Sequence, residues 1–248
     1  MRRTFLVLSG IFLLAACGHA IPTASPVPAI ASSPPLTPPD AVSELSAYAF
    51  PSLVDPAARY LFYLHGRIVE EQGIHAVSPD FGEYQYVAIL ERLAGYGFTV
   101  ISEQRPKNAD TIESAERVVG QVKALLEAGV PAANISIIGA SKGAAIAIET
   151  SYLLGNKEVN FVILSICHPD TVAEFKRNGI SLYGNVLSIY DFADTEFAGS
   201  CRDLFEFSED RGLARYDEIV LQVGSGHGIL YRPLDEWIIP AVEWAQGK

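Results

Sequence analysis

Apolar residues recur along this 248-residue chain in two patterns, as short continuous runs and as helical stripes. The continuous runs are rich in β-branched residues and predict buried strands, whereas the stripes predict amphipathic helices. The predicted strands cover 60–64, 98–102, 135–139, 161–166, 186–190 and 218–223. The predicted helices cover 84–95, 111–128, 142–154 and 234–245. This alternation indicates an α/β domain whose sheet is mostly parallel and covered by helices on both faces.

One strand and the helix that follows it are joined by Gly139-Ala140-Ser141-Lys142-Gly143. A serine in a tight strand-to-helix turn is held in strained backbone, with its hydroxyl above the edge of the sheet. Glycines two residues to either side remove Cβ atoms that would collide there. The G-x-S-x-G pattern arises often by chance, so it gains its meaning from the strand before it and the helix after it. The reactive loops of parallel sheets lie at the carboxyl ends of the strands, which is where this pattern places Ser141.

The N-terminus predicts a secretion signal over residues 1–16. Arg2 and Arg3 give it a positive start, and the apolar run over 5–16 follows. That run is shorter than the roughly 20 residues that a membrane-spanning helix needs. A cleaved signal peptide is therefore expected.

The end of that signal, Leu14-Ala15-Ala16-Cys17, resembles the lipobox of bacterial lipoproteins. The resemblance implies cleavage before Cys17 and lipidation of this residue. Gly18 stands where an Asp commonly retains such lipoproteins in the inner membrane. A lipid-anchored protein of the bacterial cell envelope is therefore expected, with the periplasmic side of the outer membrane favoured. A secreted protein with an unmodified cysteine is the alternative.

Residues 17–41 predict a tether between this lipid anchor and the rest of the chain. Seven of the fifteen prolines lie between Gly18 and Asp40, among Ala, Ser and Thr. Such a composition cannot bury a core and favours extended backbone. The remaining residues, 42–248, have the length of one domain with a substantial core.

The chain is acidic, with a formal net charge of −11 that becomes −13 when Arg2 and Arg3 leave with the signal peptide. Such a surface repels phosphate backbones and anionic lipids. Nucleic acid is therefore not an expected partner. Membrane attachment is expected through the lipid on Cys17 alone.

Two further cysteines, Cys167 and Cys201, follow predicted strands and are expected at the same edge of the sheet. An oxidising compartment favours a disulfide between them, and two free buried thiols are the alternative. The sequence contains no C-x-x-C pair and no His/Cys cluster with the spacing of metal ligands. Neither a metal nor another cofactor is expected.

From about residue 59 to 244 the chain resembles the α/β-hydrolase family. The family keeps nucleophile, acid and histidine in that chain order at successive strand ends. The resemblance implies Ser141, then Asp194 or Asp191, then His227. The histidine stands in a Gly-Ser-Gly-His-Gly loop between the last strand and the last helix, where the family has its general base.

Two carboxylates compete for the role of the acid. The family often has a glycine at the strand end and its acid three residues later, which corresponds to Asp194. Asp191 replaces that glycine here and is the alternative acid. The carboxylate without that role is expected to cap a turn. One of them is needed, because a serine hydroxyl requires a base, and the base requires a carboxylate that fixes its tautomer.

His65 and Gly66 end a predicted strand and resemble the family's oxyanion loop. The resemblance implies that the backbone N–H groups of Arg67 and Lys142 stabilise the oxyanion. His65 is expected to support this loop. The side chain of Lys142 is expected in solvent, with contact to a substrate carboxylate as the alternative. Loop structure or ion pairing is expected for the other polar residues near this edge, which are His75, Glu103, Arg105 and His168. Among them, Arg105 is also a candidate for binding an acidic substrate group.

The implied function is that of a serine hydrolase acting on a small molecule with an ester, thioester or amide bond, through an acyl-enzyme. A non-catalytic envelope binding protein of the same fold and a serine peptidase are the alternatives. No insertion long enough for a large lid lies between residues 166 and 186. An open site is therefore expected.

Overall fold

The structure is a computed structural model that describes residues 44–248. The predicted signal peptide over 1–16, the lipidation site at Cys17 and the tether over 17–41 lie outside the described residues.

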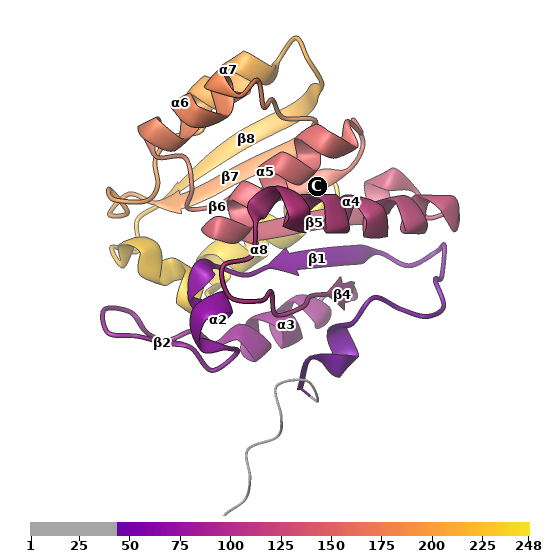
Figure 1. The fold of residues 1–248 in the computed structure, drawn as a ribbon, viewed down its shortest axis with the longest axis horizontal. Helices are drawn as coiled ribbons and strands as arrows, with labels where there is room; N and C mark the ends of the chain where they lie inside the picture. Colours follow the sequence, from indigo (N-terminus) through magenta and orange to yellow (C-terminus); the bar gives the residue numbers. More distant parts are fainter. Residues whose placement is uncertain (1–43) are drawn as a thin grey trace, which may run out of the picture. The chain divides into compact units, whose positions relative to one another are not determined.

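A six-stranded parallel sheet forms the centre of the described part of the chain (Figure 1). Every pair of neighbouring strands in it is parallel. The strand order is β4 (Thr99–Ile101), β1 (Tyr60–Leu64), β5 (Ile135–Ala140), β6 (Asn160–Leu164), β7 (Gly184–Asp191) and β8 (Leu213–Leu221). The predicted α/β architecture with a mostly parallel sheet is confirmed.

Helices cover both faces of the central strands, which explains why β1, β5 and β6 read as continuous apolar runs. All five residues of β1 are buried. Phe62 belongs to the apolar layer of one face, while Leu61 and Tyr63 belong to the layer of the other face. The first layer includes α4 (Thr111–Glu127), α5 (Lys142–Leu154), α6 (Pro169–Arg177) and α7 (Arg202–Ser208), and the second includes α3 (Tyr86–Ala94) and α8 (Asp235–Ala245). Helices α4 and α5 lie in front of the sheet in Figure 1.

The sequence predicts no helix or strand between residues 64 and 84, and this is wrong. The segment after β1 begins with the short helix α2 (Arg67–Gln72) and continues into a hairpin of β2 (Val77–Ser78) and β3 (Gly82–Glu83). The hairpin leads into α3, and Tyr84, between them, is buried. Short 3-10 turns complete the described elements at η1 (Ser46–Tyr48), η2 (Ala132–Asn134) and η3 (Gly226–Tyr231).

The structure joins Cys167 and Cys201 by a disulfide, with their Cα atoms 5.1 Å apart. Cys167 follows β6, and Cys201 directly precedes α7. Both residues are buried. The bridge therefore ties the segment after β6 to the end of the long loop after β7.

No helix within residues 44–248 is both long enough and apolar enough to cross a membrane.

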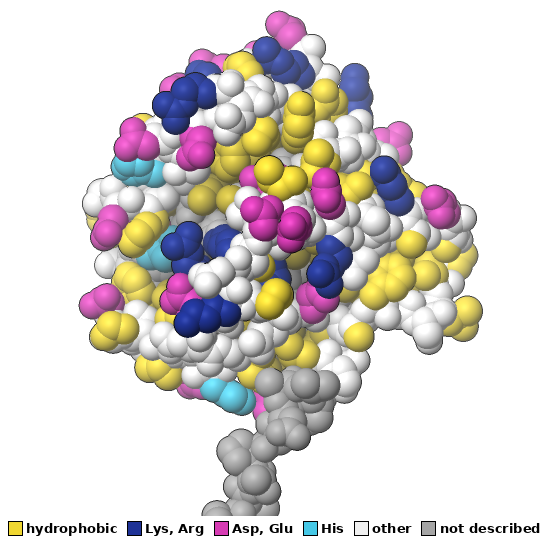
Figure 2. Space-filling view, in the orientation of Figure 1, with side chains coloured by type: hydrophobic (Ala, Val, Ile, Leu, Met, Phe, Trp, Pro, Cys, Tyr) yellow, Lys and Arg dark blue, Asp and Glu magenta, His cyan; other side chains and the backbone are white. Residues whose placement is uncertain are grey.

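Figure 2 shows the surface on the side viewed in Figure 1. Acidic and basic side chains are interspersed over it, with hydrophobic side chains between them.

Candidate active site

Ser141 lies in the turn between β5 and α5, with φ 53° and ψ −118°. A non-glycine residue rarely adopts this backbone conformation, so the turn is strained. The glycines around it are required by close packing. A Cβ atom on Gly143 would collide with the carbonyl oxygen of Leu64, and one on Gly139 would collide with the carbonyl oxygen of Gly143. This packing holds the turn against the carboxyl end of β1.

His227 lies between Ser141 and Asp194 in a chain of hydrogen bonds. Its Nε2 is 3.0 Å from the Oγ of Ser141, and its Nδ1 is 2.7 Å from the Oδ2 of Asp194. An ionised carboxylate only accepts hydrogen bonds, so Nδ1 carries the proton and Nε2 is free to accept one from the serine. The three residues come from the loops after β5, β7 and β8. The parallel sheet thus brings together side chains that are far apart in the sequence.

Asp191, the competing carboxylate, bonds to the backbone instead of to the histidine. One of its oxygens accepts from the N–H of Ala193 and the other from the N–H of Gly224, both at 2.8 Å. Its side chain is fully buried at the end of β7. Gly224 lies three residues before His227, so Asp191 fastens the loop that carries the histidine to the turn that carries Asp194.

Ser141 and His227 line a cavity together with the start of α2. The lining residues are Gly66, Arg67, Ile68, Glu71, Tyr84, Ser141, His227, Leu230 and Tyr231. Arg67 and Lys142 are the first residues of α2 and α5. The first N–H groups of a helix have no partner within it, so these two backbone donors are available to a ligand. The backbone at Gly66 is close to the serine, because a Cβ placed on it would lie 3.6 Å from that of Ser141.

Aromatic side chains surround the histidine. The ring centres of Phe81 and Phe197 lie 6.4 Å and 4.8 Å from that of His227. Both phenylalanines are exposed, by 37% and 46%.

The hydroxyl of Tyr84 bonds to that of Tyr63 at 2.8 Å, and burial raises the pKa of Tyr84 to about 12. Tyr84 is therefore neutral near pH 7 and lines the cavity without contributing a charge.

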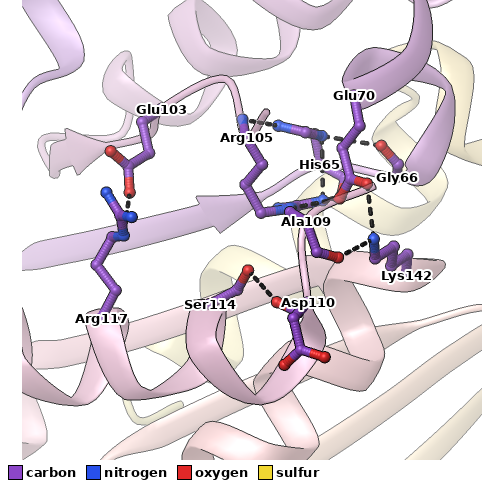
Figure 3. Close-up of polar contacts among 10 residues, drawn as sticks. All are labelled: His65, Gly66, Glu70, Glu103, Arg105, Ala109, Asp110, Ser114, Arg117 and Lys142. Atoms are coloured by element: carbon purple, nitrogen blue, oxygen red, sulfur yellow. Dashed lines mark hydrogen bonds and ion pairs between the residues drawn. The ribbon is translucent and has the colours of Figure 1, made fainter. Parts of the chain in front are cut away.

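His65 is fully buried at the turn between β1 and α2, where it supports the backbone (Figure 3). Its Nε2 accepts from the N–H of Arg105 at 3.0 Å, so its Nδ1 carries the proton and donates to the carbonyl of Gly66 at 2.8 Å. Burial, with the charge of Arg105 adding to it, lowers the pKa of His65 well below 6.5. A neutral ring bonded on both sides fits the expected supporting position.

The side chain of Lys142 lies in neither of the two places expected for it. It is only 12% exposed, and its Nζ donates to the Oε2 of Glu70 at 2.6 Å and to the carbonyl of Ala109 at 2.5 Å. Arg105 occupies the other oxygen of the same carboxylate, with its Nε 2.8 Å from the Oε1 of Glu70. Arg105 is thus in a buried ion pair, as the first expectation had it, and does not line the cavity beside Ser141.

The remaining polar candidates form surface ion pairs or cap a helix. His75 is 3.4 Å from Glu44, and Glu103 is 3.7 Å from Arg117. His168 precedes α6 and accepts from the N–H of Asp170 through its side chain. Within residues 44–248 no group of three or more His, Cys, Asp or Glu side chains is placed to hold a metal ion.

Among the comparisons with known proteins, only that with solved structures bears on the fold. No family model matches the sequence, and a search of curated proteins finds no related sequence. Solved structures are similar at low identity. Pyrococcus furiosus esterase Pf2001 is 18% identical over 78% of this chain and 85% of its own, with a TM-score of 0.52. Esterase PE8 is 16% identical over 80% of this chain and 98% of its own, with a TM-score of 0.50.

A third similar structure is the esterase Est2 of Thermogutta terrifontis, solved with propionate bound. It is 16% identical over 80% of this chain and 86% of its own, with a TM-score of 0.50. The fold is that of the α/β-hydrolases.

Within this α/β-hydrolase fold the sequence interpretation missed Glu70, whose carboxylate bonds to two buried cations. It lies on α2, for which the sequence predicts no element, because its six residues are too few to show a helical stripe. The aromatic side chains of Phe81 and Phe197 were missed as well, since they come from the hairpin before α3 and from the loop after β7. A buried carboxylate needs partners, but the sequence alone gave no sign that Glu70 is buried.

Proposed function

We propose that this protein is a serine hydrolase that cleaves an ester or related acyl bond through Ser141, His227 and Asp194. The observation that carries the proposal is the continuous hydrogen-bonded chain of these three side chains. Its two links measure 3.0 Å and 2.7 Å, and it ends in a cavity. A serine hydroxyl is a weak nucleophile until an adjacent base takes its proton, and this arrangement supplies the base.

The reaction that this geometry supports has two steps. Ser141 Oγ forms a bond to the substrate carbonyl while His227 Nε2 takes its proton, and the same nitrogen then gives the proton to the departing alcohol. Water next attacks the acyl-enzyme, with His227 again acting first as base and then as acid, which releases the carboxylic acid. Asp194 keeps the histidine in the required tautomer and stabilises its charged form.

In both steps the carbonyl oxygen gains negative charge. The N–H groups of Arg67 and Lys142 begin two helices beside Ser141 and are the proposed donors to this oxyanion. The helix dipoles add favourable potential at these positions. Both proposed donors are backbone groups, so neither the Arg67 nor the Lys142 side chain itself donates to the oxyanion.

Several features favour a small ester with an apolar acyl or alcohol group. Ile68, Leu230 and Tyr231 give the cavity apolar walls, and Phe81 and Phe197 extend apolar surface around His227. The three similar structures named above are called esterases, and one of them holds propionate. We therefore place esters ahead of thioesters and amides.

Covalent labelling tests the proposal directly. A fluorophosphonate probe is expected to label purified 42–248, and p-nitrophenyl acetate and butyrate are expected to be hydrolysed faster than the decanoate. Ser141→Ala should abolish labelling and lower kcat by about 10⁴-fold or more. Ser52→Ala is the matched control, because Ser52 is exposed and does not line the cavity.

The proposal fails if folded wild-type protein is neither labelled nor active on any of these esters. That result would favour a binding protein that uses the same fold without its chemistry. Hydrolysis of peptide amides in preference to esters would favour a serine peptidase instead.

We also propose that the chain is anchored in a bacterial envelope by lipid on Cys17, with the periplasmic side of the outer membrane favoured. The support for this is the lipobox-like sequence before Cys17. Metabolic labelling with an alkynyl palmitate analogue should mark the wild type and not Cys17→Ser. Equal labelling of both proteins would contradict the anchor.

A further inference from the structure

A cluster of buried charges joins Glu70 on α2 to Arg105 and Lys142 (Figure 3). The carboxylate of Glu70 is fully buried, and the side chains of Arg105 and Lys142 are only 7% and 12% exposed. Glu70 is bonded to Arg105 at 2.8 Å through one oxygen and to Lys142 at 2.6 Å through the other. Burying three charges is costly unless each one is paired, so the cluster holds its members in one geometry.

The cluster connects three segments that are distant in sequence. Glu70 lies on α2, whose first N–H is one proposed donor, and Lys142 is the first residue of α5, whose N–H is the other. Arg105 lies in the loop between β4 and α4. The Glu70 carboxylate therefore fixes the start of α2 relative to the start of α5, and so fixes the distance between the two donors.

The same cluster also sets the orientation of the first donor. The carbonyl of Gly66 and the N–H of Arg67 belong to one trans peptide and point in opposite directions. The Nδ1–H of His65 holds that carbonyl at 2.8 Å, so the N–H faces the other way. Arg105 in turn holds His65, through its backbone N–H to the ring and through its guanidinium to the His65 carbonyl. Glu70 orients that guanidinium.

We propose that Glu70 is a positioning residue for the oxyanion hole, acting through Lys142 on one donor and through Arg105 and His65 on the other. This inference rests on the proposed hydrolase function. Glu70 does not line the cavity, so it acts on the reaction only through these partners. Its effect should appear where negative charge develops on the carbonyl oxygen and be small in the binding of the uncharged ester.

The test replaces the charge of Glu70 while keeping its shape. Glu70→Gln is expected to lower kcat for p-nitrophenyl butyrate by about 10- to 100-fold, while KM changes by less than about threefold, because a whole oxyanion donor is worth about 10²- to 10³-fold. A trifluoromethyl ketone adds the serine oxygen to its carbonyl and gives a hemiketal oxyanion. Its inhibition constant should therefore rise in parallel with the fall in kcat. Glu103→Gln is the matched control and should change kcat less than twofold, because its ion pair with Arg117 is exposed.

Lys142→Met removes the contact between Lys142 and Glu70 by changing the lysine, and it keeps the backbone N–H of residue 142, which is the proposed donor. It should show the same lowered kcat and weakened ketone binding. The double variant of Glu70→Gln and Lys142→Met should lose less than the product of the two single losses, because both single changes remove the same Glu70–Lys142 contact, which can be lost only once. Circular dichroism and thermal unfolding establish that each variant is folded.

The outcomes separate this inference from the proposed function. If wild type is labelled and active while folded Glu70→Gln matches it in kcat and ketone binding, the positioning role is wrong and the hydrolase proposal stands. If KM rises with kcat unchanged, the role is also wrong. If Glu70→Gln does not fold, Lys142→Met decides, and if neither folds, the cluster serves stability alone and the inference fails. An inactive, unlabelled wild type would remove both proposals.

Discussion

The two halves of the candidate site are held in place by different means. The nucleophile half comprises Ser141 with the first turns of α2 and α5, and close glycine packing and a buried cluster of charged side chains fix it. The base half comprises Asp194 and His227 in the loops after β7 and β8. There the two N–H bonds to Asp191 fasten the loops, and the disulfide holds the far end of the first loop.

This difference follows from position in the sheet. β5 lies between β1 and β6 with helices on both faces, so the nucleophile half is surrounded by packed elements. β8 is an edge strand, and the loops beside it have less structure to pack against. Bonds to the backbone and a covalent cross-link therefore hold the base half in place, whereas interior packing holds the nucleophile half.

The largest expected effect concerns the two carboxylates of the base half. Asp194→Asn should lower kcat by about 10⁴-fold with little change in stability, because the amide favours the wrong tautomer of His227. Asp191→Asn should cost about 1–3 kcal/mol of stability and reduce kcat far less, since it weakens the backbone bonds between the loops. Ester hydrolysis and urea unfolding of both variants measure this contrast.

The assignment of the two aspartates would be reversed by the opposite result. Loss of turnover in Asp191→Asn, together with an active Asp194→Asn, would make Asp191 the acid and contradict the observed pairing with His227.

The disulfide should contribute the next largest effect, and to stability alone. Its cysteines are 34 residues apart in sequence. Closing a loop of that length stabilises a fold by about 4 kcal/mol. Cys167→Ala combined with Cys201→Ala should lower the urea midpoint accordingly and leave kcat at 25 °C nearly unchanged. A large fall in kcat without loss of stability would mean that the bridge shapes the site itself.

In the nucleophile half a single methyl group should be enough to disturb the packing. Gly143→Ala should cost about 2–3 kcal/mol, because its Cβ would collide with the carbonyl of Leu64. Gly120→Ala on α4 is the matched control. Apart from its chain neighbours and the adjacent backbone of α4, no heavy atom lies within 4 Å of its added Cβ, so this variant should gain up to about 1 kcal/mol of stability. Thermal unfolding distinguishes the two, and equal effects would show that packing at Gly143 is loose.

The smallest expected effect compares two buried carboxylates, Glu70 on α2 and Glu149 on α5. Glu70 has two cationic partners, whereas Glu149 has one bond to the Thr111 hydroxyl and a second oxygen without a partner. Burial raises the pKa of Glu149, with the charges of Asp110 and Glu174 adding to it. The unfolded chain loses this proton at lower pH than the folded one. Wild-type stability should therefore fall as pH rises from 4.5 through the raised pKa.

Glu149→Gln removes that ionisation. The variant should be more stable than wild type at pH 8 and should lose this advantage below pH 4.5. Urea midpoints at the two pH values measure the difference. A constant difference would contradict the assignment to Glu149.

Much of the fold could be predicted because its central elements are long and apolar. The helix expected over 142–154 has those bounds in the structure, and β1 agrees with 60–64. The six residues of α2 and the seven of α7 make too few turns for a helical stripe to be recognised. The last strand was expected over 218–223 but covers Leu213–Leu221, because most of it is exposed at the sheet edge and carries charged residues.

The site could be predicted only as far as residue types and chain order allow. Sequence reduced the acid to Asp191 or Asp194, which share one turn, and contacts with Gly224 and His227 separate them in the structure. The position of the Lys142 side chain was predicted wrongly, because its partner Glu70 lies 72 residues away in sequence. A contact between such distant segments leaves no local pattern.

The outer edge of β8 has a consequence for how the molecules behave at high concentration. Within the described residues no strand pairs with that edge, so it offers backbone groups that a second molecule could extend into a continuous intermolecular sheet. Arg215, Asp217 and Glu218 lie along this strand and discourage such pairing through the burial of charge that it would require. The charged side chains on the nine residues of β8 therefore oppose extension of the sheet into a second molecule.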